Sequence, residues 1–324
     1  MPPESGNERN PKMNRRELLQ RTTALGFWGV IPLSRVVPGG ELRESEGSSH
    51  GEQTVTFAGP LKPPASGSIP VAFVISDGAV VIDFSGPWEV FENVNVPSRT
   101  DNPFRLYTVA KNTEPIQASG GMKIIPDYSF KNAPAPKVIV IPAQNGSDAA
   151  MLNWIRESSR NADVTMSVCT GAYVLAKTGL LSGKSATTHH GAYKAFAYEY
   201  PDIHVKRGAR FVEEGNLATA GGLSSGIDLA LRVVDRYFGR DTATQTAKMM
   251  EYQGQGWLNP NSNTEFAKAP VSTPDHPLCP VCDMEVNPKT STTSVYRDKT
   301  YYFCMPDHKA MFDAAPQKFL EDAG

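Results

Sequence analysis

The residue with the clearest chemical potential is Cys169, which lies in the middle of the chain, far from the other three cysteines. The β-rich run 163–168 leads into it, and Thr170 and Gly171 open a stretch of helical composition. This order predicts a strand, a sharp turn and a helix, with the sulfur at the carboxyl edge of a sheet, where open α/β folds bind ligands. Because a helix N-terminus favours negative charge, the position favours a thiolate over a thiol.

A helix terminus alone is too weak to ionise this thiol. A free cysteine has a pKa of about 8.5, and lowering it to about 6 requires roughly 3.4 kcal/mol at about 1.36 kcal/mol per unit. A helix terminus typically supplies about 0.3–1 kcal/mol, so hydrogen-bond donors must supply the rest. Considered by itself, a free cysteine is more often a small buried hydrophobic residue. The interpretation of Cys169 as a nucleophile therefore depends on its neighbours.

The other cysteines form a second chemical signal near the C-terminus. Cys279 and Cys282 are separated by two residues, Cys304 and His308 by three, and 21 residues lie between the two pairs. Three thiolates and an imidazole suit tetrahedral zinc or Cu(I). A metal ion would also explain how so small a segment folds, because it cannot bury much core. The alternative is a disulfide between two of the three cysteines, which an exported protein would allow.

Short apolar runs and helical patterns alternate between residues 69 and 258, and these elements must position the reactive groups. The strand-like runs are 70–75, 105–110, 137–142, 164–168 and 216–220, and the helical patterns are 149–158 and 224–238. Such alternation predicts an α/β fold, with a parallel sheet and helices on both faces. Residues 259–277 are rich in Pro, Asn, Ser and Thr, which predicts a linker before a small module at 278–324.

The N-terminal segment is predicted to be a targeting signal and not part of the fold. Arg15 and Arg16, followed by an uncharged stretch at 22–34, resemble a twin-arginine export signal. The stretch is too short for a comfortable transmembrane helix. We therefore expect an export signal at 1–38 and a flexible tether at 39–68. The protein is then periplasmic or otherwise exported, with or without a membrane tether.

Length and composition exclude several classes of protein. The 324 residues suffice for a large domain with an appendage, and 40% apolar with 20% charged residues excludes a disordered chain or a multi-span membrane protein. A net charge of −2 gives no reason to expect nucleic acid as a partner. After residue 258, six Lys and Arg face nine Asp and Glu, a balance of −3 without a recognition-helix pattern, which disfavours a DNA-binding regulator.

Three segments together resemble the ThiJ/PfpI superfamily, which has the class I glutamine-amidotransferase-like fold, and within it the isocyanide hydratase branch. They are residues 82–87, 167–172 and 186–189, and the resemblance extends from about 71 to 257. It implies a flavodoxin-like sheet, a homodimer and a small-molecule substrate, with no cofactor in the α/β domain at 69–258. It also implies that Cys169 is the nucleophile, Asp83 its acid–base partner and Thr170 an assisting residue.

The implied roles fit the chemistry of an isocyanide. Its terminal carbon is electrophilic and carries a lone pair, so thiolate attack gives an imidoyl anion that a neighbouring carboxylic acid can protonate on carbon. Because like charges raise one of two neighbouring pKa values, Asp83 and Cys169 are expected to share one proton. As a carboxylate, Asp83 would then activate water against the thioimidate and release an N-substituted formamide.

Four further residues are candidates for accessory roles. Gly171 belongs to the elbow motif. Glu89 is either a structural residue or a second carboxylate, and His189 either contacts the site or makes a structural hydrogen bond. Where the family usually has Pro-Gly-Gly, residues 142–144 are Pro-Ala-Gln, so either the pocket is altered or Gln144 supplies a side-chain donor.

The terminal module at 278–324 resembles a YHS domain, a short β-rich knuckle associated with metals, although His308 stands where many such modules carry cysteine. This leaves two hypotheses from different classes. The favoured one is a cysteine-dependent lyase of the hydratase type with a metal-binding module, and the other is an exported metal-handling or thiol-sensing protein without turnover. Glyoxalase-like chemistry on small α-oxoaldehydes is a further alternative, which Thr170 in place of a histidine disfavours.

Overall fold

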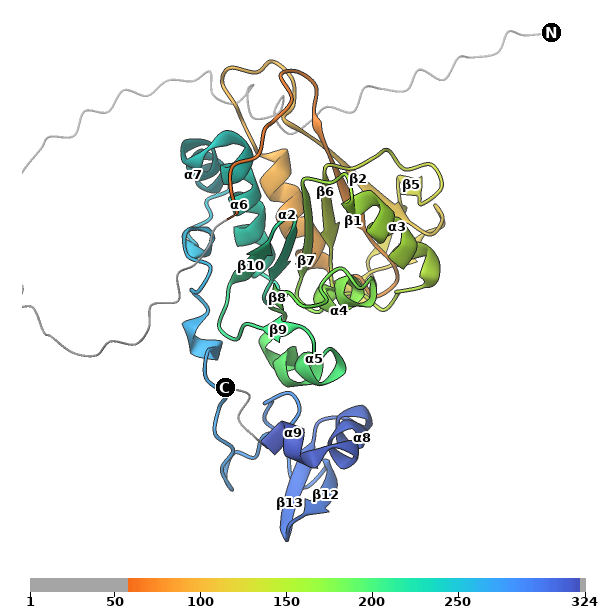
Figure 1. Cartoon of the computed structure of the whole chain (residues 1–324), viewed down its shortest axis with the longest axis vertical. Helices are drawn as coiled ribbons and strands as arrows, with labels where there is room; N and C mark the ends of the chain where they lie inside the picture. Colours follow the sequence, from red (N-terminus) through yellow and green to blue (C-terminus); the bar gives the residue numbers. More distant parts are fainter. Residues whose placement is uncertain (1–57, 321–324) are drawn as a thin grey trace, which may run out of the picture. The chain divides into compact units, whose positions relative to one another are not determined.

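The computed structural model describes residues 58–320, drawn in colour in Figure 1. The expected export signal at 1–38 and the first part of the expected tether lie outside these residues. Within 58–320, no helix is both long enough and apolar enough to cross a membrane.

A seven-stranded sheet forms the centre of the α/β region within the described residues, in the order β10-β11-β7-β6-β1-β2-β5 (Figure 1). Every neighbouring pair is parallel except β10 and β11, which are antiparallel. The strands are β1 (Ile69–Val74), β2 (Phe104–Ala110), β5 (Tyr128–Ser129), β6 (Val138–Ile141), β7 (Val164–Val168), β10 (Phe211–Glu214) and β11 (Leu217–Ala220). The predicted α/β fold with a mainly parallel sheet is confirmed.

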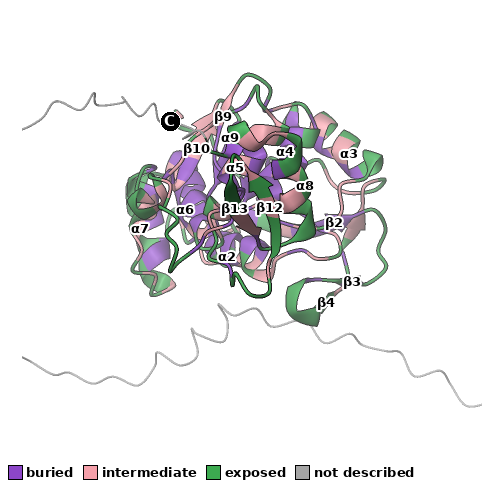
Figure 2. Cartoon of the chain, turned by 90° about the horizontal axis from the view of Figure 1, so that it is seen from below, coloured by how far each residue is buried: buried purple, intermediate pink, exposed green. Residues whose placement is uncertain are grey.

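Helices cover both faces of this sheet, because side chains along each strand alternate between two cores. Val71 and Phe73 of β1 belong to the core shared with α2, α6 and α7, whereas Ala72 and Val74 belong to the core shared with α3, α4 and α5. Most of α6 is buried (Figure 2). The helices are α2 (Val81–Glu92), α3 (Ala149–Ser159), α4 (Gly171–Lys177), α5 (Tyr193–Glu199), α6 (Ser225–Phe238) and α7 (Arg240–Met249).

The stretch 259–277, predicted as a linker, contacts the α/β region at several points. The N–H of Arg210 donates to the carbonyl of Pro260 at 2.5 Å, and the ring of Phe266 stacks on His190 with centroids 4.2 Å apart. Short strands and 3-10 turns complete this part of the chain: β3 (Ile116–Gln117), β4 (Lys123–Ile124), β8 (Ser185–Ala186), β9 (His204–Val205), and the turns Ser119–Gly121, His190–Ala192, Gly256–Leu258 and Thr264–Phe266.

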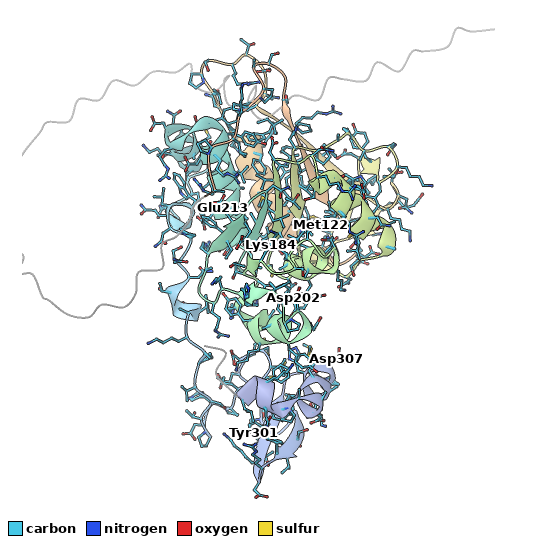
Figure 3. All side chains as sticks on the ribbon, viewed as in Figure 1. Met122, Lys184, Asp202, Glu213, Tyr301 and Asp307 are labelled. Atoms are coloured by element: carbon cyan, nitrogen blue, oxygen red, sulfur yellow. The ribbon has the colours of Figure 1, made fainter. Side chains whose placement is uncertain are left out.

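The C-terminal module is a hairpin of two antiparallel strands followed by two short helices. Its core is made of Phe303, Phe312 and Phe319, together with Cys279 and Cys282. Tyr301, labelled in Figure 3, places its ring 5.0 Å from that of Phe312. A core this small would leave a bound metal ion a large share in the stability of the module. The elements are β12 (Thr292–Tyr296), β13 (Lys299–Phe303), α8 (Pro306–Ala314) and α9 (Pro316–Leu320).

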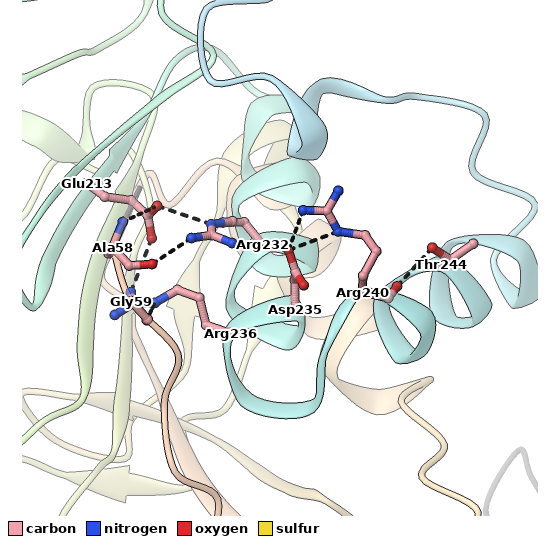
Figure 4. A network of polar contacts seen from close by, with 8 residues as sticks. All are labelled: Ala58, Gly59, Glu213, Arg232, Asp235, Arg236, Arg240 and Thr244. Carbon is pink, nitrogen blue, oxygen red and sulfur yellow. Dashed lines mark hydrogen bonds and ion pairs between the residues drawn. The ribbon is translucent and has the colours of Figure 1, made fainter. Parts of the chain in front are cut away.

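A buried network of charges attaches the start of the described chain to α6 (Figure 4). Arg232 and Arg236 of α6 bond the two carboxylate oxygens of Glu213 on β10, at 3.1 and 3.2 Å. The same guanidinium groups donate to the carbonyls of Ala58 and Gly59 at 2.7 and 3.0 Å. Because the Glu213 side chain is only 3% exposed, its charge depends on these two partners for compensation.

We predict that Glu213→Gln lowers the free energy of unfolding by about 3–5 kcal/mol, since it removes the carboxylate that pairs with the buried Arg236 and leaves Arg232 to its second partner, Asp235. Urea denaturation of the two proteins measures the difference. The control is Glu157→Gln, which removes an exposed pair with Arg160 and should cost less than about 1 kcal/mol. Equal effects of the two substitutions would contradict the importance of the buried network.

Candidate active site

Cys169 occupies the sharp turn between β7 and α4, as the sequence predicts. Its backbone is in the left-handed region, with φ 57°, which is uncommon for a residue with a side chain and typical of strained functional sites. Its N–H donates to the carbonyl of Gly221 at 2.8 Å, and its carbonyl accepts from the hydroxyl of Thr188 at 3.0 Å. The loop after β11 and the segment after β8 therefore hold the turn on both sides.

Three glycines allow the surrounding elements to approach the turn. A Cβ on Gly171 would lie 2.3 Å from the carbonyl oxygen of Ile141, so the first residue of α4 must lack a side chain. A Cβ on Gly226 of α6 would lie 2.9 Å from Val168, and one on Gly86 of α2 would lie 2.9 Å from Ile227 of α6. The site role expected for Gly171 is thus a close-packing role, which its lack of a side chain makes possible.

Asp83 lies in the first turn of α2 and is fully buried. Its Oδ2 accepts a hydrogen bond from the N–H of Ala143 at 3.1 Å, whereas its Oδ1 has no hydrogen-bond partner within the described residues. Burial raises the pKa of Asp83 to about 6, although the Ala143 N–H partly opposes the shift. The carboxyl is therefore poised to gain or lose a proton near neutral pH, which suits a general acid or base.

Cys169 is 7% exposed, and its thiol does not behave as the helix-terminus argument predicts. Burial, and next the negative charge of Asp83, raise the pKa of Cys169 to about 11. The N–H groups of Thr170 and Leu223 and the Thr170 hydroxyl lower the pKa of the thiol, so the expected donors are present, but burial outweighs them. The expectation of a resting thiolate is therefore wrong.

The expectation of a shared proton agrees with these values. Between pH about 6 and about 11 the Cys169–Asp83 pair carries one proton and one negative charge. The proton is on sulfur and the charge is on the carboxylate. Asp83 is thus suited to accept the thiol proton, and is not a donor that maintains a thiolate.

His189 takes the structural alternative. Its Nδ1 accepts from the N–H of Gly191 at 3.1 Å, so the neutral ring carries its proton on Nε2. Burial and the neighbouring His190 lower the pKa of His189, which keeps it neutral. The ring packs against Gly222, where a Cβ would lie 2.8 Å from it. The hydrogen bonds described for His189 include none to Cys169 or Asp83.

The sequence suggested site roles for Glu89 and Gln144, but the hydrogen bonds described for them are made to groups other than Cys169 and Asp83. Glu89 is exposed on α2 and accepts from the side chain of Asn93, so the alternative of a second catalytic carboxylate is not supported. The amide of Gln144 donates to the carbonyl of Val74 at 3.1 Å, and its oxygen accepts from Ser76 at 2.8 Å. Gln144 thus ties two loops together, and the donor that the 142–144 segment gives the site is the Ala143 N–H.

The cysteine cluster of the C-terminal module has the geometry of a metal site. The donor atoms of Cys279, Cys282, Cys304 and His308 all lie within 4.8 Å of one another. The sulfurs of Cys282 and Cys304 are 3.5 Å apart, close to the separation of about 3.8 Å that two sulfurs have in a tetrahedron with zinc–sulfur bonds of about 2.3 Å. All four cysteines of the chain are free thiols, so the disulfide alternative is not the arrangement found. These ligands fit zinc or Cu(I).

Comparison with known proteins assigns the α/β region to a family. Residues 70–236 match the sequence pattern of the DJ-1/PfpI family. The chain belongs to this family. A crystal structure of a ThiJ/PfpI family protein from Pseudomonas syringae superimposes with a TM-score of 0.53 at 27% identity, over 67% of this chain and 89% of that one. A putative transcriptional regulator from Vibrio parahaemolyticus, with a TM-score of 0.51 and 21% identity, shares the fold alone.

Curated DJ-1/PfpI relatives of this chain have different functions. Isonitrile hydratase of Pseudomonas putida is 33% identical over 190 residues, which cover 57% of this chain and 79% of that protein. The HTH-type transcriptional regulator GbdR of Pseudomonas aeruginosa is 22% identical over 202 residues, which cover 61% of this chain but only 54% of that protein. Family membership therefore gives the fold but does not decide the reaction.

The sequence does not reveal the backbone groups that complete the site. The carbonyl of Gly221 and the N–H groups of Ala143 and Leu223 carry no residue-type signal, because every non-proline residue has them. The Gly221-Gly222 pair is the one local sign that the chain approaches another segment closely there.

We predict that Asp83→Asn stabilises the protein at pH 8 by on the order of 3 kcal/mol and has no such effect at pH 4. A carboxyl whose pKa rises from 3.8 to about 6 on folding loses stability as pH rises through that interval, and the neutral amide avoids this loss. Urea denaturation at both pH values measures it. Asp148→Asn is the control, because hydrogen bonds lower the pKa of Asp148 and it should show no such gain. A pH-independent difference for Asp83→Asn would refute the raised pKa.

Proposed function

We propose that this DJ-1/PfpI family member is a cysteine-dependent isonitrile hydratase that converts an isonitrile and water to an N-substituted formamide. The observation that carries the proposal is the Cys169–Asp83 pair, in which a strained, buried thiol keeps its proton beside a buried carboxyl that is short of partners. The likeness to isonitrile hydratase supports this reaction over others of the family.

In the first half of the reaction, the Asp83 carboxylate removes the thiol proton while sulfur attacks the terminal carbon of the isonitrile. The carbon–sulfur bond forms, and Asp83 returns the proton to the same carbon, which gives a neutral thioimidate. The Thr170 hydroxyl and the N–H groups of Thr170 and Leu223 stabilise negative charge on sulfur during this step.

In the second half, the Asp83 carboxylate takes a proton from water as the oxygen adds to the thioimidate carbon. Asp83 passes this proton to the nitrogen, and the tetrahedral adduct then loses sulfur, which takes the hydroxyl proton of the adduct as the formamide carbonyl forms. Asp83 thus begins and ends the cycle ionised. Its raised pKa of about 6 makes it a stronger base than an ordinary aspartate while leaving it charged at neutral pH.

The alternative of a thiol sensor fits the site less well. Oxidation by peroxides requires a thiolate, and sensor cysteines have low pKa values and are exposed to solvent. Cys169 has a raised pKa and is 7% exposed, which is the opposite combination. The regulator relatives suggest ligand binding without turnover, which the turnover experiment below distinguishes.

We also infer that the C-terminal module resembles a YHS domain in function and binds zinc or Cu(I) through Cys279, Cys282, Cys304 and His308. The cluster geometry supports this. We further propose that the protein is exported through its N-terminal segment and forms a homodimer. Fractionation of the producing cells tests export, and light scattering after size exclusion tests the dimer.

We predict that the purified protein converts cyclohexyl isocyanide to N-cyclohexylformamide, measured by NMR. Cys169→Ala should abolish turnover, and Asp83→Asn should lower it by roughly 10²–10⁴-fold, because it removes the acid–base group. The control is Glu89→Gln on the same helix, which should retain wild-type turnover. Activity of Cys169→Ala equal to that of the wild type would remove the nucleophile assignment, and a wild type without turnover would favour a binding protein.

We predict an acid limb in the pH profile of this reaction. Below a pH of about 6, Asp83 is protonated and cannot accept the thiol proton, so kcat/KM should fall about tenfold per pH unit. Above pH 7 the rate should be flat through pH 9, because Cys169 keeps its proton until about pH 11. Steady-state rates between pH 4.5 and 9 measure this. A limb centred near pH 8.5 would instead indicate that a free thiolate is the attacking species in the resting enzyme.

A further inference from the structure

One short segment contacts both the nucleophile and the cysteine cluster. At its start, the Thr188 hydroxyl bonds the carbonyl of Cys169 at 3.0 Å. The ring of His189 packs against Gly222, and the next residue, Leu223, directs its N–H to the sulfur of Cys169. Residues 188–189 are therefore part of the wall around the thiol.

The same segment continues into α5, which packs on the C-terminal module. Ala195 belongs to the module's core together with Cys279 and Cys282, and the rings of Tyr198 and Phe319 are 5.0 Å apart. A Cβ on Gly191 would lie 3.6 Å from the carbonyl oxygen of Cys282. Residues 188–198 thus run from the thiol to the ligand loop of the cluster.

Asp283 makes the polar part of this contact. Its carboxylate accepts from Lys194 at 2.6 Å and from Arg207 at 3.4 Å. The three side chains are only 11–14% exposed, so these ion pairs are screened far less than pairs at the surface. One buried carboxylate thus holds α5 and the segment before β10 to the module.

The direction of the Asp283 carboxylate depends on the cysteine knuckle. Asp283 directly follows the ligand Cys282, has a left-handed backbone with φ 59°, and donates its N–H to the carbonyl of Cys279 at 2.9 Å. A metal ion bound to Cys279 and Cys282 fixes both ends of this turn. The turn that binds the metal is therefore the one that presents Asp283 to Lys194 and Arg207.

We propose that metal binding at the cysteine cluster holds Asp283 on Lys194 and Arg207 and thereby braces residues 188–198 against the Cys169 turn. The inference rests on the proposed metal binding and adds regulation to the proposed hydratase. Because coupling between two sites is reciprocal, contacts on α5 must strengthen metal binding as much as the metal strengthens the contacts.

The first test is the affinity for zinc, measured on the full-length protein by competition with a chromophoric chelator. Lys194→Met with Arg207→Met should weaken zinc binding by roughly five- to twentyfold, within the usual range of coupling. Lys194→Arg keeps the charge and should bind zinc within about twofold of the wild type. The control is Lys309→Met, which removes an exposed pair with Asp313 inside the module and should leave the affinity unchanged.

The second test is hydrogen exchange of the amides in residues 188–198, with and without zinc. Zinc should slow this exchange several-fold in the wild type, and not in the double variant or in Cys304→Ser. Lys194→Met alone should give an intermediate effect, which keeps the test valid if the double variant does not fold.

A protein that binds no zinc, a double variant with wild-type affinity, or exchange that ignores zinc in the wild type would each overturn the proposal. Neither measurement uses an isonitrile. Failure of the hydratase assignment is therefore seen separately, in the turnover experiment.

Discussion

The left-handed turn at Cys169 is the constraint on which the site depends. A turn this sharp brings the end of β7 against the starts of α4 and α6, and the chain can close there only because Gly171 and Gly226 lack side chains. The same closeness lets α2 pack on α6 through Gly86 and places Asp83 in a fully buried position. Burial then sets the protonation of the pair, since it disfavours two charges side by side more strongly than the local donors favour them.

Three buried carboxylates of the described chain differ in how completely their oxygens are paired with donors or cations. Glu213 is compensated by Arg232 and Arg236. Asp228 bonds Arg210 at 2.6 Å, the Tyr252 hydroxyl at 3.0 Å and the N–H of Trp257 at 3.0 Å, and so holds the chain after α7 in place. Asp83 has one N–H on one oxygen and nothing on the other. Incomplete hydrogen bonding of a buried acid costs stability, and among these three it occurs only beside Cys169.

Much of the fold was predictable from the sequence because the buried strands read as continuous apolar runs, and the runs at 137–142 and 164–168 agree with β6 and β7. The strand–turn–helix around Cys169 was predictable for the same reason. The antiparallel strand β10 was not predictable, since its last three residues are only partly buried and carry two glutamates.

The prediction that Asp83 lies near Cys169 came from family resemblance, because the two residues are far apart in sequence. The sequence argument predicted a lowered pKa for Cys169, and the structure raises it, because burial depends on the packing of the whole domain and not on the local motif. For Glu89 and Gln144 the residue type suggested chemistry that their hydrogen bonds do not support. The contact of Asp283 with Lys194 spans 89 residues and leaves no local pattern.

The protonated state of Cys169 has a consequence for how sulfur ligands are allocated within one molecule. A metal ion must displace the proton of each thiol it binds, so its preference between two cysteines follows their acidity. Burial and the neighbouring Asp83 carboxylate raise the pKa of Cys169 to about 11, whereas the donor atoms of Cys279, Cys282, Cys304 and His308 lie within 4.8 Å of one another. Within the described residues, a soft metal ion would therefore find a complete set of thiolate and imidazole ligands at the terminal module and not at Cys169. The chain thus holds sulfur in two different settings, a single buried thiol that keeps its proton and a cluster whose geometry suits a soft metal ion.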